Sequence, residues 1–186
     1  MMKRKWPHTY NYLTRFRDVL LARGSRPVRE LAERTAFYAM FGIGKYTVAR
    51  YKVVWKRMAS DIVAAVISQT KTPFGYKMLI PTDTTSLIAC ETEDEAHYLC
   101  GILNSAPVRE YIRSYSSAGR GFGAPSVMEH VGMAKFDSKN AVHRRLSELS
   151  RELHELRVEE DKEEITRREV EVNAGVGELF GLPDAE

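Results

Sequence analysis

The sequence predicts an α+β fold, with a small, mainly antiparallel or mixed sheet flanked by helices and a C-terminal helical hairpin. Three observations predict it. Apolar side chains recur at helical spacing over residues 7–23, alternate over residues 46–58, and return at steps of four and three residues over 142–156. The 186 residues, 44% of them hydrophobic, suffice for one sizeable core.

The N-terminal segment is expected to be helical. Residues 7–23 would form an amphipathic helix closed by Gly24, and residues 26–40 a second, shorter helix. Residues 46–58 then change to a period of two, which is typical of a strand. One face of this strand would carry Tyr51, Val53, Trp55 and Arg57. The other face would carry Lys52, Val54 and Lys56.

Three further segments are rich in residues that favour strands, namely 61–68, 77–81 and 85–90. The short connections between them predict a mainly antiparallel sheet. Helices follow: Thr92 can cap the first and Glu95 can reach back to it. Pro107 suits the first position of a second helix, or of the second half of one kinked helix.

The tail is expected to form two helices. Residues 116–125 are a loop by composition, and residues 126–133 resemble a short helix. Asp137 or Ser138 can cap the long helix that follows. Its seam consists of Val142, Leu146, Leu149, Leu153 and Leu156. A second helix ends near Gly181, so we expect residues 1–137 to form an α/β domain and residues 138–186 an antiparallel helical hairpin.

Charge is distributed unevenly along the chain. Residues 1–80 carry 16 basic and 4 acidic side chains, residues 81–137 carry 4 and 8, and residues 138–186 carry 8 and 13. A basic first half is typical of a protein that binds a polyanion, because Lys and Arg that contact phosphates release condensed counterions. A solvated basic surface is the alternative.

No catalytic motif is found in the sequence. Phe41–Tyr46 lacks the spacing of a phosphate-binding loop, and no nucleophile elbow, His-Glu-x-x-His motif or nuclease carboxylate pattern occurs. Cys90 and Cys100 are expected to be buried free thiols. The absence of a long apolar run or a signal peptide predicts a cytoplasmic protein without a membrane partner.

The best binding candidates are basic and aromatic residues around the 46–58 strand. They are Lys45, Tyr46, Arg50, Lys52, Lys56 and Arg57. Arg120, inside the glycine cluster 119–123, is a further candidate for contact with a phosphate or a groove. The alternative for that cluster is a simple surface turn.

Several segments together resemble the C-terminal specificity region of TaqI-type adenine-N6 DNA methyltransferases and of the combined restriction-modification enzymes that share it. The segments are Tyr46–Arg57, with its Tyr-Lys-Val-Val-Trp core, Glu95–Ser105, ending in Leu-Asn-Ser, and the tail segments 146–150 and 172–182. The resemblance covers most of residues 40–182.

The resemblance implies a domain that reads double-stranded DNA while another domain binds S-adenosylmethionine and methylates the flipped adenine. This chain has no Pro-Pro dipeptide and no glycine-rich cofactor turn, so we expect neither cofactor nor catalysis in it. The catalytic domain would lie in the same polypeptide or in a partner. A specificity subunit of a multisubunit system and a helical-hairpin interaction module that dimerises through its seam are the alternatives.

Overall fold

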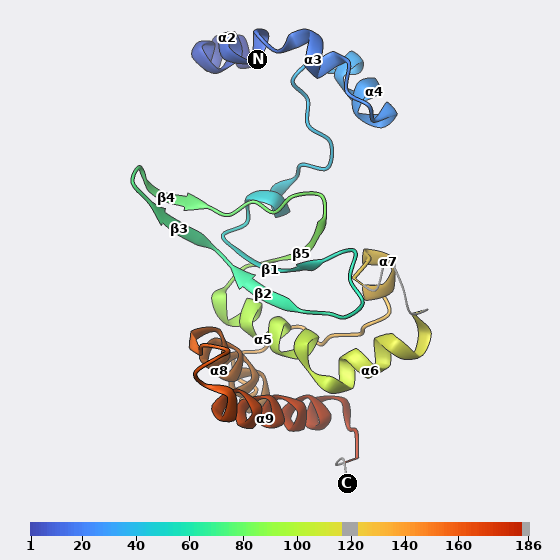
Figure 1. The fold of residues 1–186 in the computed structure, drawn as a ribbon, viewed down its shortest axis with the longest axis vertical. Helices are drawn as coiled ribbons and strands as arrows, with labels where there is room; N and C mark the ends of the chain where they lie inside the picture. Colours follow the sequence, from blue (N-terminus) through green and yellow to red (C-terminus); the bar gives the residue numbers. More distant parts are fainter. Residues whose placement is uncertain (117–122, 184–186) are drawn as a thin grey trace. The chain divides into compact units, whose positions relative to one another are not determined.

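A computed structural model of the chain describes residues 1–116 and 123–183. The chain divides into two compact units, Met1–Gly44 and Lys45–Glu186, so the boundary expected at residue 137 lies inside the second unit. The α+β fold class is confirmed, because small antiparallel sheets are flanked by helices and two helices close the chain (Figure 1).

The first unit consists of short helices. They are α1 (Met2–Lys5), α2 (Pro7–Thr14), α3 (Arg17–Leu21) and α4 (Arg26–Arg34). The single helix expected over residues 7–23 is wrong, because the chain is interrupted at Arg15 and Phe16. Their N–H groups donate to carbonyls three residues back, at 3.2 and 3.0 Å, and this tighter turn ends α2. Helix α4 is also shorter than the 26–40 helix expected there.

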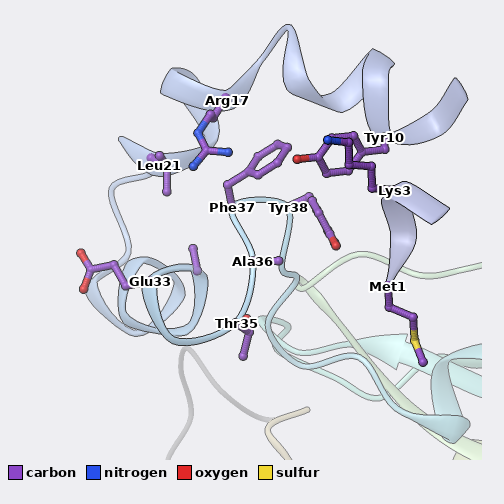
Figure 2. Close-up of a pocket in the computed structure, with 11 residues that line it drawn as sticks. Met1, Lys3, Tyr10, Arg17, Leu21, Glu33, Thr35, Ala36, Phe37 and Tyr38 are labelled. Carbon is purple, nitrogen blue, oxygen red and sulfur yellow. The ribbon is translucent and has the colours of Figure 1, made fainter. Parts of the chain in front are cut away.

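Arginine side chains hold the segment after α4 in place. The guanidinium of Arg17 lies 4.8 Å from the centroid of the buried Phe37 ring, a cation–π contact. Arg23 donates hydrogen bonds to the carbonyl oxygens of Leu20, Phe37 and Ala39. Side chains around Phe37 line a hollow of about 470 Å³ (Figure 2). This unit is therefore organised by polar contacts as much as by an apolar core.

The second unit begins with a 3₁₀ turn, η1 (Lys45–Val48), and its described residues include five strands. These are β1 (Tyr51–Lys56), β2 (Ala64–Ile67), β3 (Gln69–Thr72), β4 (Gly75–Met78) and β5 (Thr85–Cys90). Strand β1 lies in the centre of one sheet, antiparallel to both β2 and β5. Strands β3 and β4 form a separate hairpin. The strand expected over 46–58 is thus shortened at its start by η1, and β3 was not predicted.

Two side chains form hydrogen bonds along the outer edge of β2, where the described residues provide no neighbouring strand. Asn104 accepts a hydrogen bond from the N–H of Ala64 at 2.8 Å and donates to its carbonyl at 2.9 Å. Further along, Nε2 of His154 accepts from the N–H of Val66 at 3.0 Å. These contacts satisfy an edge that would otherwise be open to pairing with another strand.

Within the described residues, five helices follow the sheet. They are α5 (Glu93–Asn104), α6 (Ala106–Tyr115), α7 (Pro125–Met128), α8 (Ala141–Glu155) and α9 (Lys162–Phe180). The expected cap by Thr92 is confirmed, since its Oγ1 accepts from the N–H of Glu95. Glu95 also reaches back, but it accepts from the N–H of Glu91, the residue before the cap, and not from that of Thr92. The predicted cap of α8 is wrong: Asn140, and neither Asp137 nor Ser138, accepts from the first N–H groups.

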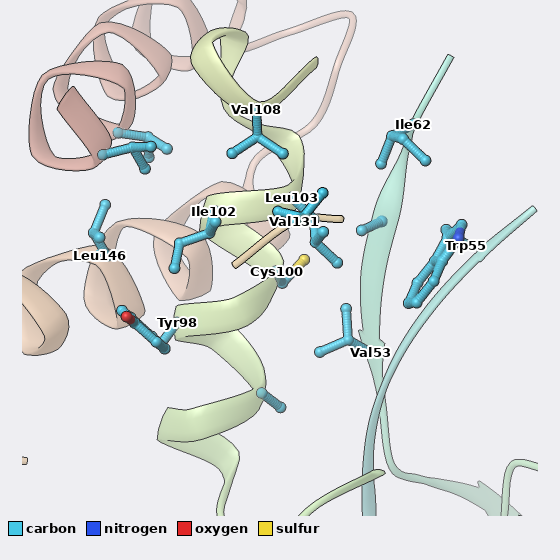
Figure 3. Packing of buried hydrophobic residues seen from close by; sticks show 14 of the residues in the cluster. Val53, Trp55, Ile62, Tyr98, Cys100, Ile102, Leu103, Val108, Val131 and Leu146 are labelled. Carbon is cyan, nitrogen blue, oxygen red and sulfur yellow. The ribbon is translucent and has the colours of Figure 1, made fainter. Parts of the chain in front are cut away.

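Helix α5 lies between the sheet and the C-terminal helices and supplies the centre of the core (Figure 3). Val53 and Trp55 of β1 point toward it from one side and Leu146 of α8 from the other, around Tyr98 and Ile102 of α5. Burial of these apolar side chains is the main favourable contribution to folding. The tail helices therefore share one core with the sheet.

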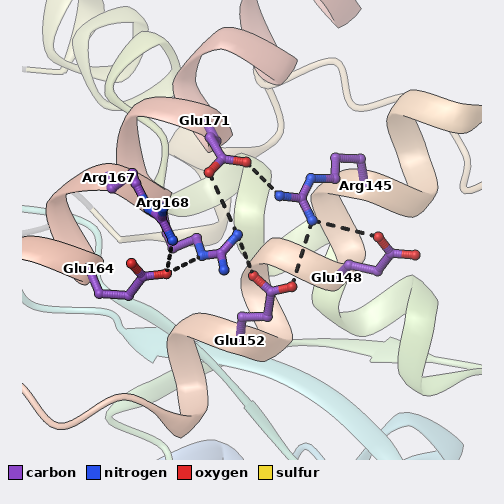
Figure 4. A network of polar contacts seen from close by, with 7 residues as sticks. All are labelled: Arg145, Glu148, Glu152, Glu164, Arg167, Arg168 and Glu171. Atoms are coloured by element: carbon purple, nitrogen blue, oxygen red, sulfur yellow. Dashed lines mark hydrogen bonds and ion pairs between the residues drawn. The ribbon is translucent and has the colours of Figure 1, made fainter. Parts of the chain in front are cut away.

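Helices α8 and α9 form the antiparallel hairpin that the sequence predicts. Arg145 near the start of α8 pairs with Glu171, whereas Glu152 near its end pairs with Arg168 at 2.9 Å (Figure 4). This order of partners indicates that the helices run in opposite directions. Leu149, from the seam expected to dimerise in one alternative, is only 1% exposed and belongs to the chain's own core.

Candidate nucleic-acid interface

The turn η1 and the two ends of β1 position most of the predicted binding residues. Lys45 and Tyr46 belong to η1 and are exposed. Arg50 precedes β1 and is exposed, with its guanidinium 5.2 Å from the centroid of the Tyr51 ring. At the other end, Lys56 and Arg57 are also exposed, and these residues are therefore accessible to a ligand.

Lys52 is the exception, because its burial contradicts the prediction that it contacts DNA. The side chain is 0% exposed. Its Nζ donates hydrogen bonds to the carbonyl oxygens of Ala49 and Leu79, at 2.5 and 3.1 Å. Desolvation by burial lowers the pKa of this ammonium group. The alternation along β1 correctly places Lys52 and Val53 on opposite faces of the strand. The face that carries Lys52 is covered at this point by the turn after η1 and by the chain that leaves β4.

The last residue of the glycine cluster, Gly123, is anchored near the end of β1. The carbonyl oxygen of Gly123 accepts hydrogen bonds from Trp55 Nε1 at 2.9 Å and from Ser86 Oγ at 3.0 Å. A Cβ atom at Gly123 would lie 2.1 Å from the carbonyl oxygen of Lys56, so only glycine fits there. Arg120, the remaining predicted contact, lies outside the described residues.

In the sequence, the charges around β1 are almost entirely positive. Between Glu33 and Asp83, Asp61 is the only carboxylate in the sequence. Asp61 is already paired, 3.0 Å from Arg113 and 3.8 Å from Arg109. In the fold, Asp83 and Glu91 flank the paired strand β5, and Arg57 Nη1 donates a hydrogen bond to the carbonyl oxygen of Asp83 at 3.3 Å. Within residues 1–116 and 123–183, no carboxylate lies within ion-pair distance of the exposed cations of this region. These are Lys45, Arg50, Lys56 and Arg57.

No protein-family model and no curated protein sequence matches the chain. Its own geometry and charge must therefore indicate what it binds. In the part of the chain that the structure describes, no three His, Cys, Asp or Glu side chains are grouped to hold a metal ion. Nor does any helix in that part combine the length and apolar character needed to cross a membrane.

The nucleophilic and titratable side chains of the core are in unreactive surroundings. Cys90 and Cys100 are buried free thiols, and burial raises the pKa of each to about 12. His97 is 5% exposed, and desolvation lowers its pKa to about 4. Its Nδ1 lies 3.2 Å from Ser150 Oγ. These groups contribute to packing rather than to an accessible reaction site.

Sequence reasoning missed the hairpin of β3 and β4, which carries exposed basic and aromatic side chains. Phe74 at its tip is 88% exposed and Tyr76 is 70% exposed. Lys71 and Lys77 are exposed as well. The signal was present in Thr72-Pro73-Phe74-Gly75, because proline followed closely by glycine is typical of a turn between two strands. The polar sequence of β3 concealed the first of these strands.

Proposed function

We propose that this chain binds double-stranded DNA through the exposed basic residues of η1 and β1. In this proposal it is the sequence-recognition part of an adenine-N6 DNA methyltransferase or of a related restriction-modification enzyme. Methyl transfer then belongs to a separate domain that binds S-adenosylmethionine, either in the same polypeptide or in a partner protein. This chain contributes the contacts that place that domain on its target.

The observation that carries the proposal is the set of cations without carboxylate partners around β1. Arg50, Lys56 and Arg57 are exposed, while Asp61, the nearest acidic residue in the sequence, is paired with Arg109 and Arg113. DNA phosphates would supply the missing negative charge, and release of their condensed counterions would favour binding. Tyr46, 46% exposed beside Lys45, adds an aromatic surface.

The resemblance to the methyltransferase specificity region supports the second half of the proposal. Several of the residues that carry the resemblance have a structural role in this fold. Asn104 satisfies the free edge of β2, and Ser105 caps α6. Val53 and Trp55 pack in the core. A shared pattern of scaffold residues is expected when two chains share an architecture and differ in the side chains that read DNA.

The seam of α8 does not favour the alternative of a dimerising helical module. Leu146 is 0% exposed and Leu149 1% exposed within a single chain. A dimer built on this seam would require these side chains to leave the core, at a cost of several kcal/mol in lost burial. In this proposal, α8 and α9 give structural support to the sheet that carries the DNA-binding residues.

A selection experiment tests the proposal. The full chain is mixed with a pool of duplexes that contain a random segment, at near-physiological salt, where non-specific binding is weakened. Bound duplexes are recovered, amplified and sequenced over several rounds. We expect enrichment of one common sequence. Equal recovery of all sequences would contradict sequence recognition, and no recovery would contradict DNA binding altogether.

A further inference from the structure

The hairpin of β3 and β4 presents its side chains to solvent on both faces. Lys71 lies opposite Tyr76, and Thr70 lies opposite Lys77. Because directly paired residues share a face, each face of the ribbon carries one lysine. Among the described residues, neither strand pairs with a third strand. Phe74, between the two strands, is 88% exposed.

The hairpin is complementary to a polyanion. No acidic residue occurs from residue 62 to residue 82. Its two lysines have no carboxylate within ion-pair distance in the described part of the chain. A large exposed aromatic side chain that lies between two cations in the sequence suits a ligand with phosphates outside and base edges inside.

The turn of the hairpin is fixed by its own residues. Thr72 Oγ1 accepts a hydrogen bond from the N–H of Phe74 at 3.2 Å and donates to the carbonyl oxygen of Gly75 at 2.6 Å. Gly75 has a φ of 95°, a value that side chains disfavour, and Pro73 restricts its own φ. The backbone of the turn that presents Phe74 to solvent therefore has little freedom left to lose on binding.

The base of the hairpin is tied to the main sheet. The N–H of Leu79 donates to the carbonyl oxygen of Ser68 at 3.0 Å. The carbonyl of Leu79 accepts from the buried Lys52 of β1 at 3.1 Å. The hairpin thus has a fixed root beside the start of β1, where the exposed Arg50 lies.

We propose that this hairpin enters the major groove of the duplex and that Phe74 contacts the C5-methyl group of a thymine. The dimensions agree: strands about 5 Å apart make a ribbon that fits a groove about 12 Å wide, and four residues at about 3.3 Å each exceed its depth of about 8.5 Å. Phe is one of the side chains that make apolar contacts with that methyl group. This inference rests on the proposed function and names the element that reads the bases.

The test uses the duplex recovered by selection and the full chain with Phe74→Ala. We expect affinity to fall by about tenfold, with no change in the dependence of affinity on salt, because no phosphate contact is lost. Tyr111→Ala is the matched control, an aromatic residue 52% exposed on α6. Its affinity should equal that of the unaltered chain, and thermal melting should confirm that both variants are folded.

Replacement of each thymine in turn by deoxyuridine, which lacks the methyl group, identifies the contact. At one position we expect weaker binding by the unaltered chain and no further weakening of Phe74→Ala. Equal affinity of Phe74→Ala and the unaltered chain, or deoxyuridine effects that persist in the variant, would overturn the inference and leave the proposed function standing. Failure of the unaltered chain to bind any duplex would overturn both.

Discussion

The buried ammonium group of Lys52 donates a hydrogen bond to the carbonyl oxygen of Leu79, 27 residues further along the chain. A second hydrogen bond to Ala49 joins the same group to the turn that ends η1. One side chain thereby connects the central strand, the turn that carries Lys45, and the root of the β3–β4 hairpin. Lys52 therefore stabilises the backbone that carries the candidate interface and does not contact DNA itself.

This role predicts that Lys52→Met destabilises the fold. Methionine preserves the apolar stem but removes the charged donor from the part-buried carbonyls of Ala49 and Leu79, hydrogen bonds that contribute about 1.5–3 kcal/mol each. The free energy of unfolding in urea measures the effect. Lys56→Met, at an exposed position on the same strand, should change stability by less than about 0.5 kcal/mol. Equal effects of the two substitutions would refute the supporting role of Lys52.

Gly123→Ala should destabilise the chain by about 1–3 kcal/mol, because the new Cβ overlaps the carbonyl oxygen of Lys56 and must displace the backbone. The displacement also weakens the hydrogen bonds from Trp55 and Ser86. Gly132→Ala is the control, since its Cβ would meet nothing within 4 Å. Thermal melting compares them, and a Gly123→Ala melting temperature at or above that of the control would be the opposing result.

Acid should weaken the fold through His97. The unfolded side chain takes up a proton below about pH 6.5, whereas the folded one does so only near pH 4. Stability from this group is complete above pH 6.5 and is lost as the pH falls toward 4, by roughly 3 kcal/mol in total. Burial is the main cause of the lowered pKa, with His154 and Arg151 adding to it and Asp94 opposing it.

Unfolding measured between pH 7 and pH 4 tests the contribution of His97. His97→Gln retains a group able to bond Ser150 but does not titrate, so its stability should decline less steeply than that of the unaltered chain. His8→Gln, on the exposed surface of α2, serves as the control and should follow the unaltered chain. Parallel curves for all three proteins would contradict the lowered pKa of His97.

Leu149→Ala should reduce stability by about 2–5 kcal/mol, because it removes a side chain that is 1% exposed in the core. Val170→Ala removes an apolar side chain that is 62% exposed on α9 and should have little effect. Light scattering should give the same oligomeric state for both variants and the unaltered chain. A dimer in the unaltered chain that Leu149→Ala dissociates into stable monomers would instead indicate an intermolecular seam.

Local patterns predicted much of the fold. The alternation around Trp55 identified the central strand, and Thr92 with Glu95 identified the start of α5, because these signals involve neighbours in sequence. Contacts between distant residues could not be predicted in this way. Lys52 is buried because Leu79 and Ala49 cover it, and alternation only indicates which face a residue occupies. Asn140 caps α8 although Asp137 and Ser138 offered similar chemistry.

The candidate site was predicted in part. Charge identified the basic region, and its exposed members Arg50, Lys56 and Arg57 are where the sequence places them. The hairpin was missed because β3, with the sequence Gln-Thr-Lys-Thr, has no apolar alternation. Its pairing with β4 is visible only in three dimensions. Polar ribbons outside a core leave a weak sequence signal for this reason.

The salt dependence of duplex binding tests the central claim most directly. The logarithm of the association constant is measured against the logarithm of salt concentration for the unaltered chain and for Arg50→Ala/Lys56→Ala/Arg57→Ala. Each lost phosphate contact should reduce the magnitude of the slope by about 0.9, or roughly 3 for the three residues together. The control Lys135→Ala/Lys139→Ala/Lys162→Ala removes the same charge from exposed positions elsewhere and should leave the slope unchanged. Equal slopes for the two triple variants would contradict the claim that the β1 region binds DNA.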